Sequence, residues 1–382
     1  MKGLVEMTGQ QRDLVAMVHD FMNKEIKPHI REFEEEGCYP DRLIQAGKDM
    51  GLTVMQVPEA YGGLGLDTTT TAMMLEEGSR VESTYMSMFN ITNMGAKIVM
   101  KVGTEEQKKY YAGLLADGAM ASFCLTEAET GSDASSVRTT AVKKGDQYII
   151  NGTKMFITNG GIADVYLVVA SLDRSKRYRG LATFIVERSR PGVSVGKKED
   201  KLGMRLSNTT EVIFDDVAIP AANLVGTEEG GFVNAMKVLE VSRPLVAASS
   251  VGSARQTVEL AVKYSKERVQ FGKPICQFQA IQLMLADMEM RTNAARALVY
   301  NATRLIDEGK PCAKEAAMAK CYASDAYQKN ATDAVQIFGG YGVMKDYLVE
   351  KLYRDSKITQ IVEGTNQIQR LVIAGEMIKE SK

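Results

Sequence analysis

The sequence predicts an α+β protein of several domains: an N-terminal all-α domain, a middle antiparallel β domain and a C-terminal four-helix bundle. The 382 residues exceed the usual size of one domain. Strand-like segments gather in one stretch, between residues 120 and 225. Apolar residues recur at helical spacing on both sides of that stretch. We therefore expect domains at residues 1–118, 119–228 and 229–382.

The N-terminal region is expected to be helical, because apolar residues recur every three or four positions from residue 11 to residue 36. Residues 61–67 contain three glycines and interrupt the pattern, so a loop is expected there. Their spacing is not that of a phosphate-binding loop. The helical pattern resumes over residues 69–100 and 105–115.

The middle region is expected to form a small antiparallel β domain. Residues 147–150 lead into Asn151-Gly152, a pair that favours the type I′ turn of a hairpin. Further β-rich runs cover residues 165–170, 181–186 and 211–217.

Long helices are expected in the C-terminal region, after Gly230-Gly231. Alanine and methionine gather on their faces, which favours packing into a bundle. Three helical patterns are each long enough to cross a domain, and a fourth helix should follow the last loop. These patterns cover residues 232–267, 278–307, 312–338 and 366–379.

The composition of the chain narrows its function. Lysine and arginine total 47, aspartate and glutamate total 48, and the net charge is −1. A nearly neutral chain has no overall electrostatic attraction for nucleic acid or for an anionic membrane. The sequence contains no uncharged apolar run of membrane-spanning length, and its first residues have no signal or transit pattern. We expect a cytoplasmic protein, with a mature mitochondrial-matrix enzyme as the alternative.

The scarcity of histidine limits the chemistry. His19 and His29 are the two histidines, and their spacing is not that of a helical metal pair. We therefore expect neither a histidine-based triad nor a metal site. A catalytic base is then expected to be a carboxylate. Redox chemistry would need an organic cofactor, because side chains alone do not carry hydride.

Glu363 is the candidate base. It stands between an apolar pair and Gly364. Apolar neighbours disfavour the charged form of a carboxyl group, and glycine lets a ligand or another backbone approach closely. The alternative interpretation is a surface glutamate before a helix that has Thr365 or Asn366 as its N-cap.

Three other segments have the composition of a ligand site. Residues 123–133 form a strand pattern that ends in a turn rich in hydroxyl and N–H groups, which can bind a ring edge and a phosphate. Residues 154–160 contain an aromatic residue, Phe156. Residues 267–282 place Arg268 near an aromatic residue and a Gly-x-Pro turn, which suits a pyrophosphate. The plain alternatives are a polar turn, a buried aromatic residue in a hairpin and a solvated arginine at a helix end.

Together the four segments resemble the signatures of the acyl-CoA dehydrogenases, and the order of the α, β and bundle regions resembles that fold nearly from end to end. Three residues depart from the usual pattern: Val362 replaces tyrosine, Ala128 replaces proline, and Phe156 replaces tryptophan or tyrosine. In that family the glutamate at the position of Glu363 is the catalytic base. Some relatives carry the base on the first long helix of the bundle, where this chain has Ser242, so the resemblance assigns the role to Glu363.

The resemblance also implies sites for FAD and for the CoA thioester. Leu125 and Thr126 would contact the pyrimidine end of FAD, and Thr158 would bond near its N5 atom. The residues implied in FAD binding are Phe123, Leu125, Thr126, Ser132, Phe156, Ile157, Thr158, Arg268, Phe271, Gln279, Gln336, Gly339, Gly340, Thr365 and Gln367. The residues implied in substrate binding are Ser132, Glu240, Arg243 and Gly364. Those that would hold the FAD of a neighbouring subunit are Arg268, Phe271, Gln279, Gln336 and Gly340.

The implied function is α,β-dehydrogenation of an acyl-CoA. Glu363 would remove the α proton while the β hydrogen leaves as hydride to FAD, and the electrons would pass to an electron-transferring flavoprotein. The chain would form a homotetramer. Alternatives on the same fold are an acyl-CoA oxidase, a flavin monooxygenase, an enoyl-CoA reductase and a catalytically silent scaffold, and the intact Glu363 argues against the last.

The acyl group would be bound by the helix that covers residues 75–95 and by Val362 and Tyr341. Glutaryl-CoA dehydrogenases, which the chain resembles, hold the distal carboxylate with an arginine at the position of Met86. Without that cation a dicarboxylate would lose its partner, so we expect a neutral short, cyclic or aromatic acyl group. Asn90, Thr92 and Asn93 either add polarity to this pocket or form a solvated helix face.

Overall fold

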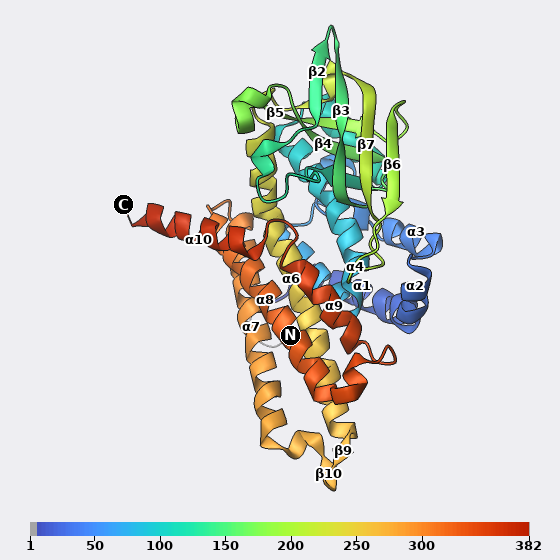
Figure 1. Ribbon diagram of the computed structural model, residues 1–382, viewed down its shortest axis with the longest axis vertical. Helices are drawn as coiled ribbons and strands as arrows, with labels where there is room; N and C mark the ends of the chain where they lie inside the picture. Colours follow the sequence, from blue (N-terminus) through green and yellow to red (C-terminus); the bar gives the residue numbers. More distant parts are fainter. Residues whose placement is uncertain (1–5, 382) are drawn as a thin grey trace.

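The computed structural model describes residues 6–381, and the fold has the predicted order of helices, sheet and helices (Figure 1). The sheet occupies one end of the molecule, and the long C-terminal helices extend from it toward the other end. The predicted fold class is confirmed. Within residues 6–381, no helix is long and apolar enough to cross a membrane.

The region predicted to be helical over residues 11–36 is helical, but it is bent rather than continuous. α1 (Gly9–Phe21) is followed by a π-helical turn, a 3-10 turn and α2 (Ile30–Glu36). Pro28 lies in the 3-10 turn, where its missing N–H cannot continue an α-helical ladder. The other N-terminal helices are α3 (Asp41–Asp49), α4 (Thr68–Val102) and α5 (Glu105–Ala116).

α4 is the central helix of the N-terminal region. It begins at a side-chain cap, where Asp67 accepts a hydrogen bond from the N–H of Thr70 at 2.6 Å. Glu82 has non-helical backbone angles and kinks the helix. Its buried carboxylate pairs with Lys351 at 2.8 Å, so the kink is tied to the C-terminal region. α4 packs lengthwise against α6 (Gly231–Glu267).

The middle region is one sheet in the order β6-β7-β3-β2-β4-β5-β8, with β1 beside β4. Most pairs are antiparallel, but β1 runs parallel to β4, which the prediction of an antiparallel domain did not include. The strands are β1 (Ala121–Cys124), β2 (Thr140–Lys144), β3 (Gln147–Thr158), β4 (Val165–Ser171), β5 (Leu181–Glu187), β6 (Val193–Lys198), β7 (Thr209–Pro220) and β8 (Leu224–Val225).

The hairpin predicted at Asn151-Gly152 is wrong. β2 and β3 do pair as a hairpin, but its turn is Gly145-Asp146, and β3 continues through Asn151-Gly152. Gly152 lies at a register shift between β3 and β7, which is a β-bulge. A Cβ atom at Gly152 would lie 2.5 Å from the Thr139 hydroxyl oxygen, so this glycine serves close packing rather than a turn.

The C-terminal region is a helical bundle, with one helix more than predicted. Its remaining elements are α7 (Gln279–Asp307), α8 (Ala313–Phe338), α9 (Val349–Thr359), α10 (Asn366–Glu380) and the short strands β9 (Val269–Gln270) and β10 (Lys273–Pro274). α9, which was not predicted, packs against α8 and α6. α10 is the helix predicted as the fourth, and it projects away from the bundle (Figure 1).

Candidate active site

Glu363 lies in the loop between α9 and α10, in an unusual backbone conformation. Its φ is 53° and that of Gly364 is 93°, so two successive residues are left-handed. This conformation costs a non-glycine residue about 1–2 kcal/mol, and strained positions of this kind cluster at functional sites. The N–H of Asn366 closes the loop by donating to the carbonyl of Gln360 at 3.0 Å. Thr365 is the N-cap of α10, as the alternative interpretation predicted.

The carboxyl group of Glu363 is buried, which argues against a surface role. Its Oε1 accepts a hydrogen bond from the Ser242 hydroxyl at 2.9 Å. Its Oε2 is buried and has no partner within the described chain. Burial raises the pKa of Glu363, while the Ser242 hydrogen bond and the charges of Lys97, Arg243 and Lys320 act to lower it. A raised pKa and a free oxygen suit a carboxylate that accepts a proton from a bound molecule.

Three cations from three helices act on this carboxylate. Lys320 on α8 donates to the carbonyl of Gly364 at 2.9 Å. Arg243 on α6 donates to the carbonyl of Glu363 at 3.5 Å. The ammonium group of Lys97 on α4 is buried and has no hydrogen-bond partner in the described part of the chain. Burial lowers the pKa of Lys97 and that of Lys320, each to about 8.

Sequence reasoning missed Lys97 and Lys320. Lys97 stands in a mostly apolar stretch at the end of α4, and Lys320 stands in an alanine-rich stretch of α8. Lysine is almost never fully buried unless it is paired. A lysine on the apolar face of a predicted buried helix is therefore the signal that could have identified both residues.

The residues predicted to bind substrate are only partly gathered at Glu363. Arg243 and Gly364 lie there. Glu240 precedes Arg243 on α6, and its charge acts on the Arg243 guanidinium. Ser132 is exposed in the loop after β1, and no hydrogen bond joins it to Glu363 in residues 6–381.

Two of the other predicted segments meet beside the sheet. The loop after β1 lies against β3, where the N–H of Met155 donates to the carbonyl of Thr126 at 2.9 Å. The buried ammonium of Lys154 donates to the carbonyl of Leu125 at 3.0 Å and to the carboxylate of Glu127 at 2.8 Å. These contacts hold Leu125 and Thr126 next to the last residues of β3.

The end of β3 presents an aromatic ring to solvent. The side chain of Phe156 is 59% exposed, and its φ is 58°. An exposed ring on a left-handed backbone is an open face for another ring to stack on. The side chain of Ile157 instead packs in the core of the sheet, and that of Phe123 packs partly buried against α6. The side chains of Ile157 and Phe123 therefore offer little open surface to a ligand, and their role in FAD binding stays a prediction.

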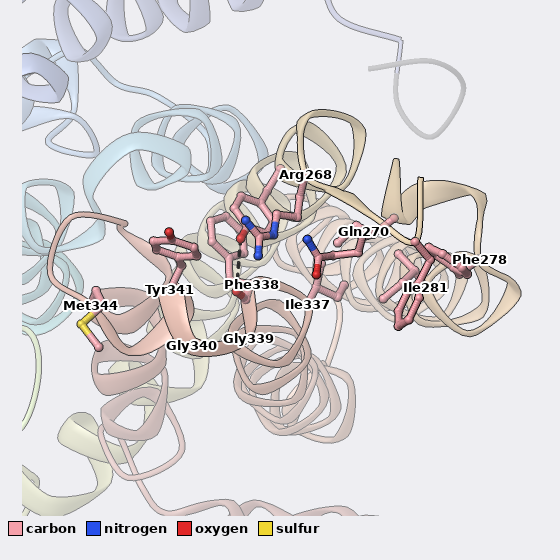
Figure 2. A pocket seen from close by; sticks show the side chains of 13 residues that line it. Arg268, Gln270, Phe278, Ile281, Ile337, Phe338, Gly339, Gly340, Tyr341 and Met344 are labelled. Atoms are coloured by element: carbon pink, nitrogen blue, oxygen red, sulfur yellow. Dashed lines mark hydrogen bonds between the residues drawn. The ribbon is translucent and has the colours of Figure 1, made fainter. Parts of the chain in front are cut away.

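A third group lines a cavity of about 770 Å³ at the C-terminal end of α6 (Figure 2). Arg268, Gly339 and Gly340 lie on its wall, and the Arg268 guanidinium lies over the ring of Tyr341, 5.5 Å from its centroid. Phe271 has a φ of 51° and is 94% exposed. A Cβ atom at Gly339 or Gly340 would meet nothing within 4 Å, so a bound group could approach the backbone there.

The remaining predicted residues lie outside that cavity. Gln279 and Gln336 are exposed. Gln336 faces a separate hollow of about 400 Å³. Thr365 and Gln367 line another, of about 420 Å³, at the start of α10.

The cavity and the Glu363 carboxylate lie far apart along α6. Ser242, which holds Glu363, precedes Arg268 by 26 positions on that helix. At a rise of 1.5 Å per residue they are about 40 Å apart.

Comparison with known proteins gives consistent matches. The N-terminal, middle and C-terminal domain models of acyl-CoA dehydrogenase match residues 8–119, 122–217 and 229–378. An acyl-CoA dehydrogenase of Bacillus subtilis is 48% identical, over 97% of this chain and 98% of the relative. A 3-(aryl)acrylate reductase of Clostridium sporogenes is 42% identical, over 97% of this chain and 99% of the relative.

Solved structures agree with these matches. The butyryl-CoA dehydrogenase of Megasphaera elsdenii superposes with a TM-score of 0.95 at 42% identity, over 98% of this chain and 99% of that chain. A chain from the structure described as "Electron transferring flavoprotein of Acidaminococcus fermentans: Towards a mechanism of flavin-based electron bifurcation" gives a TM-score of 0.95 at 44% identity, over 97% and 98% of the two chains.

Proposed function

The chain belongs to the acyl-CoA dehydrogenase family, and on that premise we propose that Glu363 is its catalytic base. The enzyme is an FAD-dependent oxidoreductase that dehydrogenates an acyl-CoA thioester between its α and β carbons. The free, buried Oε2 of Glu363 carries the assignment, because a proton acceptor needs an oxygen that no other group occupies. The hydrogen bond from Ser242 to Oε1 fixes the orientation of the carboxylate.

The backbone of Glu363 supplies a second element of the chemistry. Its N–H donates to no acceptor within the described residues, so it is available to the thioester carbonyl oxygen of a substrate. A donor at that oxygen stabilises the negative charge that develops when the α C–H is deprotonated. One residue would thus hold the carbonyl through its backbone and remove the proton through its side chain.

Two separate groups of residues fit FAD in complementary ways. Thr126 and Thr158, with the exposed ring of Phe156, would bind its isoalloxazine ring. Arg268 and the open backbone of Gly340 would bind the phosphates of the FAD held by a neighbouring chain. When bound, FAD supplies the acceptor for the β hydrogen, which leaves as hydride.

The pH dependence should report Glu363. A base works only when deprotonated, so kcat/KM should rise with pH through the pKa of Glu363, which burial raises. The Ser242 hydroxyl stabilises the charged form, and Ser242→Ala should therefore shift this acid limb to higher pH. The measurement is kcat/KM against pH for both proteins. An unchanged limb in Ser242→Ala, with FAD content intact, would remove Glu363 as its source.

We also infer a homotetramer, because Arg268, implied in holding a neighbour's FAD, lies about 40 Å along α6 from Ser242 and the Glu363 site of the same chain. Large apolar side chains lie exposed on α7 and α10, including Leu283, Met290, Leu371 and Ile378. Exposed apolar surface of this kind marks a protein interface. Light scattering of the purified protein should give a multiple of the 41.9 kDa chain. A monomer that carries a full complement of FAD would contradict the inference.

The electron acceptor proposed for this enzyme is an electron-transferring flavoprotein, by its likeness to the Acidaminococcus chain. The resemblance to a 3-(aryl)acrylate reductase supports a second candidate, the reverse reduction of an enoyl-CoA. An acyl-CoA oxidase would differ from both by rapid reaction of its reduced flavin with oxygen. We propose a cytoplasmic location and domain limits at residues 1–118, 119–228 and 229–382.

A neutral acyl group is proposed for the substrate. Met86 is fully buried and packs against Gly78 of the same helix, where a Cβ atom at Gly78 would lie 2.5 Å from the Met86 Cγ. The methionine side chain carries no charge. A glutaryl carboxylate would find no cation at the position of Met86, in a partly dry site. We expect kcat/KM for butyryl-CoA to exceed that for glutaryl-CoA by about thirtyfold. Preference for glutaryl-CoA would show that another cation binds the carboxylate.

A further inference from the structure

Lys97 differs from three other buried lysines, Lys154, Lys320 and Lys351. The ammonium group of Lys154 has two acceptors, the carbonyl of Leu125 and the carboxylate of Glu127. Lys320 likewise has two acceptors, in Gly364 and Asn366, and Lys351 has two, in Glu82 and Asp355. The ammonium of Lys97 is equally removed from water and has none within residues 6–381. The fold satisfies its other buried cations and leaves this one open.

The ammonium of Lys97 lies within electrostatic range of the Glu363 carboxylate. Lys97 and Glu363 lie on different elements, and the charge of each acts on the other. They form no ion pair in the described structure, so their charged groups are more than the 4.0 Å of a direct contact apart. The free Oε2 of Glu363 is the only other open charged atom of this cluster among the described residues. A bound molecule could therefore lie between the two groups.

A second open polar atom lies on the same face of α4. Asn90 and Lys97 are seven residues apart, which is two helical turns or about 10 Å. The side-chain oxygen of Asn90 is buried without a donor. Asn93 lies on another face of α4. Its side-chain nitrogen donates hydrogen bonds to the carbonyls of Leu52 and Phe89. Asn90 thus adds a second unsatisfied polar atom to the face of α4 that carries Lys97.

Packing does not explain Lys97. An unpaired charge is costly to bury, and an unbranched apolar residue such as methionine would fill the same volume without that cost. Burial lowers the pKa of Lys97 to about 8, so at neutral pH it is still largely a hydrogen-bond donor that lacks an acceptor. A bound molecule could supply that acceptor, because no residue in 6–381 does.

Building on the proposed function, we propose that Lys97 determines substrate specificity by donating a hydrogen bond to an uncharged oxygen, such as an ether, hydroxyl or carbonyl oxygen, on the acyl part of the CoA thioester. The acyl part begins at the thioester carbonyl carbon, and the oxygen that Lys97 would bind lies beyond the α carbon that Glu363 deprotonates. An uncharged oxygen is favoured over a carboxylate because a second anion beside Lys97 would be repelled by Glu363. Further anions nearby, Glu240 and Asp325, already balance the charges of Arg243 and Lys320.

The test compares acyl-CoAs that differ by one atom. In 4-methoxybutanoyl-CoA an ether oxygen replaces one methylene of hexanoyl-CoA, and 5-hydroxypentanoyl-CoA places an oxygen one position further along. For the holoenzyme, at least one oxygenated substrate should exceed hexanoyl-CoA in kcat/KM by about tenfold. In Lys97→Met that ratio should fall to about one. Titration calorimetry of the corresponding oxygenated enoyl-CoA should show a matching loss of affinity in Lys97→Met.

The matched control is Lys101→Met, the same substitution one turn further along α4 at an exposed position, which should keep the wild-type ratio. FAD content and thermal midpoint show whether Lys97→Met is folded. A ratio of one in the wild type, an unchanged ratio in folded Lys97→Met, a glutaryl-CoA preference lost in Lys97→Met, or loss of FAD from Lys97→Met would each overturn the proposal. Failure of the proposed function is a different result, because then neither hexanoyl-CoA nor butyryl-CoA would be oxidised by the wild type.

Discussion

Replacing Glu363 with glutamine is expected to lower turnover by at least about 10²-fold, the usual contribution of a positioned base. Glutamine keeps the size of the side chain and can still bond to Ser242, but its amide accepts no proton. FAD content and acyl-CoA affinity should remain close to those of the wild type, because the cofactor residues lie elsewhere. The measurement is steady-state turnover of butyryl-CoA with an artificial electron acceptor.

The matched control for this substitution is Glu35→Gln, at an exposed position of α2, which should leave turnover unchanged. It separates loss of the base from loss of a negative charge in general. Turnover near the wild-type rate in Glu363→Gln would contradict the assignment. Loss of FAD from Glu363→Gln would show a structural role instead.

Replacing Lys154 with methionine is expected to destabilise the protein by about 3 kcal/mol, because it leaves the buried carboxylate of Glu127 without its cation. Thr139 still donates to Glu127 through its N–H and hydroxyl, which keeps the expected loss at the lower end of the range for a broken buried pair. The loop that carries Leu125 should loosen, so FAD should also bind more weakly. Denaturant unfolding followed by circular dichroism measures the first effect, and FAD titration of the apoprotein measures the second.

The control for Lys154→Met is Lys143→Met, on β2 of the same sheet. This substitution breaks an exposed ion pair with Glu228. Exposed pairs contribute little to stability, so no measurable change is expected there. Equal stability of the two variants would contradict the role assigned to the Lys154–Glu127 pair.

The long helices could be predicted from the sequence because apolar periodicity is a local signal. The pattern over residues 69–100 corresponds to α4 (Thr68–Val102), and that over 278–307 corresponds to α7 (Gln279–Asp307). The hairpin at Asn151-Gly152 failed because pairing with β7 and contact with Thr139 override the local turn preference. Such pairing depends on residues distant in the sequence.

The candidate site was predictable only in part, for the same reason. Glu363 could be identified from its loop and its family resemblance, and the structure adds its left-handed backbone and free oxygen. Lys97 and Lys320 stand about 266 and 43 positions away from it, counted on the sequence. Their convergence arises from the packing of α4, α6 and α8, which no local pattern encodes.

The most direct test of the account is the rate at which butyryl-CoA bleaches the bound flavin without oxygen, in a single turnover of wild type and of Glu363→Gln with equal FAD content. This measurement isolates the removal of the two hydrogens from product release and from reoxidation. If Glu363 is the base, bleaching should be rapid in the wild type and at least about 10²-fold slower in the variant. Equal rates in the two proteins, or no bleaching of the wild type by any acyl-CoA, would contradict it.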